Sequence, residues 1–474
     1  MALSSPGIGS GLDVNSLVAQ LMAIERRPLT RLDQQEATFQ AQISAYGSVK
    51  GALSSLQSAA AALVNPATMR ALKTTVADST LLTATVGASA VIGSYAMEAT
   101  TLAQAHKLKS ASFSSPTTVV GSGAITIAFG AYADSVNGTG IFTLNPDKAA
   151  KTVTLGSSQS TLAGIRDAIN AAGVGVAATI LNDGTGHRLV LSSQDTGLVN
   201  QLKITASDDD ATHSDNTGLS QLVYDGTVGL ANLTKAQAAQ NAALTIDGIA
   251  VSQASNTLTD AIQGVTLTVL KTNLGSPTRL TVVRDNAVAQ SAVEGFVKAA
   301  NDTLATVKTL SAYNATTKQA AILQADATVR AIQTALRRAL TQPLTAASGG
   351  LTTLSDIGLS FQKDGTLTLE RAKLQTVIAD PTKDLATFFA AVQIDTVAGN
   401  LLRASGTVTT RTEGIARSIT DLTQHRDVLT QRLTRVEARL RAQFSALDTA
   451  LGQLRATSDF LTQQLSRLPT TSSR

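Results

Sequence analysis

Apolar side chains recur at helical spacing near the N-terminus. Leu17, Leu21 and Ile24 lie three to four residues apart, which predicts an amphipathic helix over residues 14–27. A second stretch with the same period runs over residues 29–63. We therefore expect two successive helices that each bury one face.

Short polar residues and prolines mark where these helices begin and end. Asp13 or Asn15 can cap the first helix, because a short side-chain acceptor satisfies its free backbone amides. Pro28 ends that helix or starts the next one, since proline lacks an amide hydrogen. The second periodic stretch breaks at Asn65-Pro66.

The most specific periodic signal lies near the C-terminus, over residues 415–468. Steps of four and three from Ile415 meet mostly apolar residues, and a leucine recurs at every seventh position from Leu433 to Leu468. Such a heptad row keeps one stripe of a helix facing a partner helix. The apolar seam residues are Leu422, Leu429, Leu433, Val436, Leu440, Leu447, Leu454, Leu461 and Leu468.

The row beside these leucines weakens toward the C-terminus, where it reads Gln443, Ala450, Thr457 and Gln464. Small and polar residues there predict a shallow seam, shared among several helices or with the N-terminal helix, rather than a tight two-stranded zipper. A helix over 415–468 would be roughly 80 Å long, which favours an extended or intermolecular coil. A helix packed inside its own domain is the alternative.

The middle of the chain reads as strands. Between about Thr74 and Val283, short runs rich in Thr, Val and Ile alternate with clusters of Gly, Asn, Asp and Ser. Asn182-Asp183-Gly184 separates two alternating runs, which predicts a hairpin. A short helix is expected over residues 161–172.

The helical period returns over residues 285–344, and a strand pair turning on Asp364-Gly365 precedes more helix. Because helices at both ends frame strands in the middle, we predict an α+β multidomain fold. In this fold, helical coiled-coil terminal legs enclose an inserted β-rich head of two small domains. The predicted domains are 1–50 with 425–474 (terminal coiled-coil helices), 51–90 with 285–424 (helical leg), 91–125 with 240–284 (first head domain) and 126–239 (second head domain).

Composition and motifs exclude several classes of site. The 474 residues include no Cys, which excludes disulfides and thiolate ligands, and the four His lie far apart without ligand spacing. No H-E-x-x-H, G-x-S-x-G or phosphate-loop motif occurs, so we expect no enzyme, cofactor or metal. No apolar run reaches about 18 residues and the start does not resemble a cleaved signal, so no membrane insertion is expected.

A leucine row also occurs in zipper proteins that bind DNA, and these place a dense basic helix before the zipper. Residues 403–432 carry five Arg against three acidic residues, a net charge of +2, and Gly406 and Gly414 interrupt them. That charge is too low to follow a phosphate backbone, so no nucleic-acid partner is expected.

The N-terminal residues resemble those of a known family. Gly9-Ser10-Gly11-Leu12-Asp13, followed by Pro28 within Glu-Arg-Arg-Pro-Leu, looks like the start of the bacterial flagellar filament cap proteins, FliD or flagellar hook-associated protein 2. The segment around Asp364-Gly365 resembles the C-terminal region of that family. Residues 160–193 and 243–270 are similar to motifs repeated in flagellar hook and filament proteins.

The resemblance implies a secreted, non-enzymatic cap: a ring of four to six copies at the distal tip of the flagellar filament. Such a cap would retain exported flagellin and promote its folding and polymerisation during elongation. Its other partners would be hook-filament junction proteins and an export chaperone at the C-terminal segment. It would leave the cell through the flagellar type III apparatus, without a cleaved signal peptide.

On this interpretation, Leu17, Leu21, Ile24 and the C-terminal seam residues make coiled-coil contacts with other copies or with the filament tip. An adhesin at the flagellar tip, whose head binds host mucin or glycans, is the alternative and can coexist with capping. No aromatic platform in the sequence supports it, since Phe and Tyr make up only 3% of the chain and Trp is absent.

Overall fold

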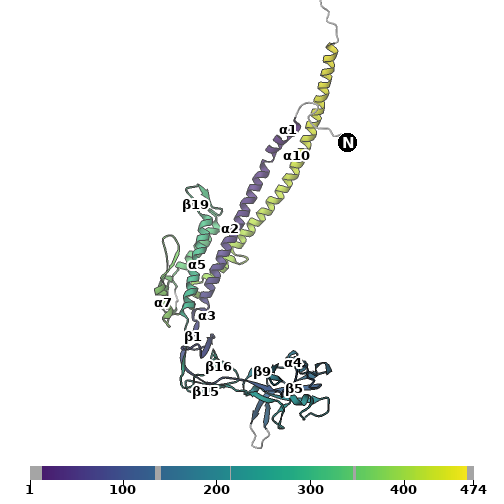
Figure 1. Ribbon diagram of the computed structural model, residues 1–474. Helices are drawn as coiled ribbons and strands as arrows, with labels where there is room; N and C mark the ends of the chain where they lie inside the picture. Colours follow the sequence, from purple (N-terminus) through teal and green to yellow (C-terminus); the bar gives the residue numbers. More distant parts are fainter. Residues whose placement is uncertain (1–12, 134–139, 214, 345–347, 467–474) are drawn as a thin grey trace, which may run out of the picture. The chain divides into compact units, whose positions relative to one another are not determined.

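The computed structural model forms two compact units (Figure 1). Unit 1 joins the two ends of the chain, Met1–Met69 and Asn286–Arg474, whereas unit 2 is the continuous segment Arg70–Asp285. The described residues are 13–133, 140–213, 215–344 and 348–466. Unit 1 is mainly helical and unit 2 is built mainly from antiparallel strands, which confirms the predicted α+β fold with strands inserted into a helical frame. The finer division into four domains stays a prediction.

Long helices from both ends of the chain dominate unit 1. α2 contacts α5 and α10 along its length, and α1 contacts α10. The helices are α1 (Val14–Glu25), α2 (Arg27–Val64), α3 (Pro66–Met69), α5 (Asn286–Ser311), α6 (Ala327–Thr341), α7 (Arg371–Ala379), α8 (Leu385–Val392), α9 (Ile394–Leu402) and α10 (Thr407–Ser466).

The predicted boundaries of the first two helices are confirmed. The Asp13 carboxylate caps α1 by accepting a hydrogen bond from the Ser16 amide at 3.0 Å. Pro28 lies in the first turn of α2, where a missing amide hydrogen costs nothing. Asn65 ends α2 with an extended backbone, and its side chain accepts a hydrogen bond from the Ala67 amide.

The core of unit 1 forms around one face of α2. The buried residues Tyr46, Val49, Leu53, Leu56 and Leu63 recur every three, four or seven positions, as expected for a helix that packs along one side. They belong to a single apolar cluster with side chains from the helices that follow unit 2 in the sequence. Unit 1 therefore cannot form its core until both ends of the chain are present.

A short hairpin in unit 1 contains Asp364 and Gly365. β21 (Leu359–Phe361) and β22 (Leu367–Leu369) pair as predicted. The Asp364 carboxylate accepts hydrogen bonds from the Thr366 amide and hydroxyl at 3.0 and 2.7 Å, and Gly365 has a φ of +89°, which favours glycine. These two family-signature residues thus shape the turn.

The same hairpin is fixed to α5 by one side-chain amide. The Asn301 oxygen accepts from the Leu367 amide at 2.7 Å, and its nitrogen donates to the Leu367 carbonyl at 2.8 Å. An asparagine side chain thereby pairs with the strand as another strand's peptide group would.

The predicted helical stretch over residues 285–344 is interrupted in one place. A hairpin of β19 (Tyr313–Asn314) and β20 (Gln319–Ala320) separates α5 from α6. The Asn314 side chain accepts hydrogen bonds from the amides of Thr316 and Thr317, at 3.0 and 3.1 Å. Such side-chain bonds compete with helix formation, and the spacing of apolar residues does not reveal them.

One helical stretch of unit 1 is apolar enough to cross a membrane by length and composition alone. It lies within Leu385–Ser466 and reaches a mean hydropathy of 1.4 over 18 residues. However, 44% of that window is buried inside the protein, and Phe388 and Phe389 of α8 belong to the core cluster. This burial indicates core helices, and the absence of membrane insertion stays a prediction.

Unit 2 consists mainly of antiparallel strands, and α4 (Leu162–Ala171) is an α-helix among its described residues. The strands are β1 (Leu72–Val76), β2 (Leu82–Val86), β3 (Gly93–Thr101), β4 (Ala105–Lys109), β5 (Gly123–Ala133), β6 (Ile141–Leu144), β7 (Lys151–Leu155), β8 (Val176–Asn182), β9 (His187–Thr196), β10 (Gln201–Asp208), β11 (Tyr224–Asp225), β12 (Leu230–Ala231), β13 (Thr234–Gln237), β14 (Ala242–Ile246), β15 (Ile249–Gln253), β16 (Thr257–Ile262), β17 (Val265–Val269) and β18 (Thr278–Arg284).

Two apolar clusters hold these strands together. The first includes Leu267 and Leu280 and lies among sheets ordered β1-β18-β3-β14-β15 and β16-β17-β2. The second includes Ile125, Ile165 and Leu189. It lies among α4 and sheets ordered β12-β11-β10-β5-β6 and β13-β4-β9-β8, with β7 also paired to β5.

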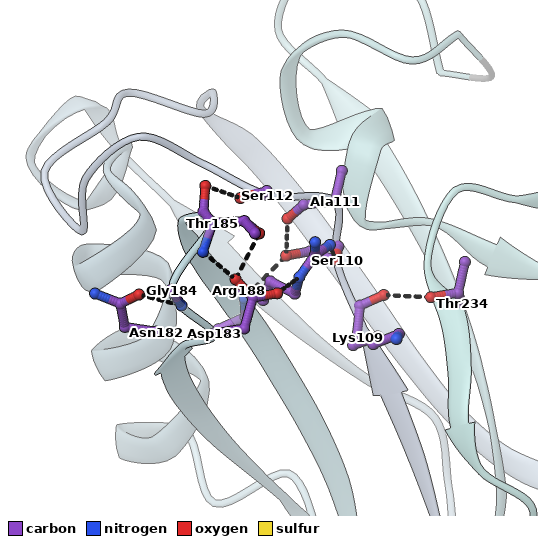
Figure 2. Close-up of polar contacts among 11 residues, drawn as sticks. Lys109, Ser110, Ala111, Ser112, Asn182, Asp183, Gly184, Thr185, Arg188 and Thr234 are labelled. Atoms are coloured by element: carbon purple, nitrogen blue, oxygen red, sulfur yellow. Dashed lines mark hydrogen bonds and ion pairs between the residues drawn. The ribbon is translucent and has the colours of Figure 1, made fainter.

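The predicted hairpin at Asn182-Asp183-Gly184 is confirmed, with Asn182 paired to His187. Figure 2 shows the Asp183 carboxylate facing the Arg188 side chain, to which it is bonded at 2.5 Å, while Arg188 also donates to the Ser110 carbonyl at 3.2 Å. The Arg188 guanidinium and Thr185 hold the pKa of Asp183 well below its usual value. The turn is therefore bonded both within itself and to the end of β4.

One histidine of unit 2 should make its stability depend on pH. His106 is 1% exposed; its Nδ1 accepts the Leu202 amide at 2.9 Å, and its Nε2 has no partner. Burial, with a contribution from Lys235, lowers the His106 pKa from 6.5 to about 4. As pH falls, His106 is protonated in the unfolded state before it is protonated in the folded state. The free energy of unfolding of unit 2 should therefore decrease by about 3 kcal/mol between pH 6.5 and 4.

This loss can be measured by chemical denaturation of the full chain at several pH values, with hydrogen exchange in unit 2 as the readout. The His106→Gln variant should remove most of the slope between pH 6.5 and 4. His213→Gln is the matched control, because His213 is exposed and also accepts a backbone amide through Nδ1. Equal slopes in the wild type and in His106→Gln would contradict the prediction.

Candidate functional site: the terminal helix pair

The helices from the two ends of the chain share a short apolar seam. Val14, Val18 and Met22 of α1 are buried, four residues apart, against Leu433 of α10. Leu29 of α2, with Leu429, Val436, Leu440 and Phe444 of α10, packs around them and is partly buried. This seam is small, so it contributes far less burial than the core around α2.

Polar contacts lie beside the seam. Glu437 of α10 pairs with Arg26 at 3.1 Å and with Arg441 at 2.9 Å, and Arg441 also donates to the Asn15 side chain at 3.0 Å. Arg441, together with Arg26, lowers the pKa of the Glu437 carboxyl. These pairs are solvent-exposed, so they fix the alignment of the helices more than they add stability.

The structure buries a different face of α1 from the one that the spacing predicted. Leu17 is half-buried, whereas Leu21 and Ile24 are 40% and 58% exposed and lie outside the seam. They remain available on the surface of a single chain. Whether they contact another copy stays a prediction.

The predicted residues of α10 divide into two groups. Leu433 is buried, and Leu422, Leu429, Val436 and Leu440 are partly buried within unit 1. Leu447, Leu454 and Leu461 are 46%, 66% and 54% exposed, and Leu468 lies outside the described residues. Figure 1 shows the reason: α10 continues past the end of α1.

Beyond α1, the exposed part of α10 has a stronger heptad pattern than the row of Gln443, Ala450, Thr457 and Gln464 indicates. Residues four positions after each leucine of the row include Phe444, Leu451 and Leu465, and Leu465 is 66% exposed. We call Leu447, Leu451, Leu454, Leu461 and Leu465 the tip stripe; Leu451 is partly buried, and the other four are exposed. Its alternating steps of four and three are those of a coiled-coil seam, interrupted at Ser458.

The family-signature residues have structural roles where they are described. Asp13 caps α1, Pro28 starts α2, and Asp364 and Gly365 form a turn. Gly9, Ser10, Gly11 and Leu12 lie outside the described residues. Within the described part of the chain, no group of three or more His, Asp or Glu side chains is placed to hold a metal ion.

Comparison with known proteins gives matches along nearly the whole chain. Residues 10–106 match the N-terminal model of the flagellar hook-associated protein 2 family, and residues 239–456 match its C-terminal model. Flagellar hook-associated protein 2 of Escherichia coli K12 is 33% identical over 98% of both chains. The B-type protein of Pseudomonas aeruginosa is 31% identical over 99% of this chain and 98% of its own length.

A solved structure supports the same relationship. The crystal structure of the D1-D2-D3 domains of the Escherichia coli flagellar cap protein FliD aligns with a TM-score of 0.65 and 31% identity. The alignment covers 78% of this chain and 99% of that structure.

Proposed function

The chain belongs to the flagellar hook-associated protein 2 family, the FliD cap proteins of the bacterial flagellum, and we propose that it caps the distal tip of the growing filament. This is a family of structural flagellar proteins rather than of enzymes. In this role the chain retains exported flagellin and promotes its folding and polymerisation. The observation that carries the proposal is family membership along the whole chain together with the uncovered tip stripe.

The tip stripe suits a cap that must stay bound to the filament end and also shift as subunits are added beneath it. Its leucines stabilise an assembly only when another helix covers them, and fully burying each one contributes roughly 1.5–3 kcal/mol to the free energy of association. A short seam to α1 and an uncovered extension of α10 support contacts that form and break as subunits are added beneath the cap. We propose that these contacts join four to six copies in a ring and dock them on the filament.

The remaining parts follow from the same proposal. Unit 2 supplies the head, and the two apolar clusters within it support its division into two small domains. Hook-filament junction proteins and an export chaperone at the C-terminal segment are the further partners, with export through the flagellar type III apparatus without signal cleavage. Among the described residues of unit 2 every aromatic side chain is buried or partly buried, which gives the adhesin alternative no support.

A truncation tests the capping role. A chain that ends at Ala446 keeps the seam around Leu433 but lacks the tip stripe. Cells that make only this chain should release flagellin into the medium as monomers and build no filaments. The truncated chain must itself be detected outside the cell, because loss of chaperone binding would otherwise give the same phenotype. Normal filaments with the truncated chain exported would contradict the proposal.

A further inference from the structure

Unit 1 contains an open groove between α6 and the junction of α8 and α9, with a volume of about 880 Å³. We call it the α6 groove. It lies apart from the tip stripe, on different helices. Its floor and walls are formed mainly by small and apolar side chains, namely Ala327, Ala331, Ala335, Ala339, Pro343, Leu344, Ala391, Val392 and Val397.

The groove forms because one face of α6 packs into the core and a neighbouring face does not. Val329, Ile332, Leu336 and Leu340 pack into the core of unit 1. The neighbouring row of α6 has an alanine at every fourth position, so no side chain on it extends beyond a methyl group. A row of alanines beside larger side chains leaves a channel, into which the side-chain ridge of another helix fits.

The charged residues around the α6 groove determine which kind of helix can bind there. Arg330 and Arg338 line the groove, together with Thr334, Gln342 and Gln393, and no acidic residue lines it. α6 itself contains no Asp or Glu. The acidic residue that precedes it, Asp326, caps the helix and pairs with Arg411 at 3.1 Å. The rim of the groove is therefore positively charged.

We propose that the α6 groove binds an amphipathic helix of a partner protein, one that presents acidic side chains beside a narrow apolar stripe. Arg330 and Arg338 are eight residues apart, about 12 Å along the helix axis. Acidic side chains about two turns apart on the partner can reach both guanidiniums while small apolar residues between them contact the alanines. This inference does not depend on the capping role, since a chain that failed to cap filaments could still bind such a helix.

Binding of designed peptides to the full chain tests the inference. The probe is a fluorescent helical peptide of about five turns, with an Ala/Leu stripe and Glu residues two turns apart, and its counterpart carries Gln in place of Glu. Fluorescence anisotropy should show the Glu peptide binding about tenfold more tightly than the Gln peptide, with an affinity that falls as salt rises.

Variants of the chain separate the groove from general attraction to a basic protein. Arg330→Glu with Arg338→Glu should weaken binding of the Glu peptide by about tenfold or more. Arg337→Glu is the matched control, because Arg337 is exposed on α6 but does not line the groove, and it should change the affinity by less than about twofold. Ala331→Leu should also block binding, and its exposed position leaves the melting temperature unchanged.

Three results would overturn the inference. Equal affinities for the Glu and Gln peptides would remove the charge selection. An equal effect of Arg337→Glu and of the double variant would show that the groove itself is not the site. Self-association that the double variant abolishes, without binding of either peptide, would assign the groove to a second copy of the chain instead.

Discussion

Replacing Leu454 and Leu461 by Gln should abolish the ring assembly that we propose and leave single copies, without unfolding either unit. Both side chains are exposed in the single chain, 66% and 54%, so the change removes little from its own core. In an assembly each covered leucine contributes roughly 1.5–3 kcal/mol, and losing two per chain weakens association by at least about a hundredfold. Native mass spectrometry over a concentration series measures the change.

Val428→Gln is the matched control for this pair. Val428 also lies on α10 and is 68% exposed, but it falls outside the heptad rows that form the tip stripe. Its replacement should leave the number of copies unchanged. If the Leu454 and Leu461 variant assembled like the wild type, the tip stripe would not join copies, and other surfaces of the chain would have to do so.

The sequence was sufficient to predict the first two helices with their ends, and the insertion of strands between helical ends of the chain. The cap at Asp13, the start of α2 near Pro28 and the turns at Asp183 and Asp364 each depend on residues next to one another in the chain. Local hydrogen bonds decide these features, and local sequence contains the donors and acceptors. The hairpin after Ser311 was not predicted, because the Asn314 turn depends on side-chain hydrogen bonds that the spacing of apolar residues does not reveal.

The face that each terminal helix buries could not be predicted in the same way. α1 has two apolar rows, one with Val14, Val18 and Met22 and the other with Leu17, Leu21 and Ile24. Either row can form a seam, and the position of α10 decides between them. That position depends on the packing of α2 against α5 and α10, which involves residues hundreds of positions apart.

The tip stripe is the opposite case, because its pattern is present in the sequence itself. A row three residues after each leucine becomes polar, whereas the row four residues after each leucine, although it includes Glu437 and Ser458, also has Phe444, Leu451 and Leu465. Both offsets are compatible with a heptad. The second row therefore indicates a stronger seam at the C-terminal end than the shallow one that the first row predicts.

Phe296→Ala should destabilise unit 1 by about 3–5 kcal/mol and leave unit 2 intact. Phe296 is 1% exposed, and its ring centroid lies 6.0 Å from that of Phe389, which in turn lies 5.3 Å from Phe388. Removing the ring leaves a cavity among side chains from both ends of the chain. Because unit 2 has its own apolar clusters, its melting should not change.

The reciprocal variant is Phe129→Ala, which removes a ring that is 3% exposed in the core of unit 2. Thermal unfolding with hydrogen exchange as the readout assigns each transition to its unit. Phe296→Ala should lower the transition of unit 1 by about 10 °C, and Phe129→Ala should lower only that of unit 2. A single transition that both variants lower equally would show that the two units unfold together, and the inserted head would then not be an independent folding unit.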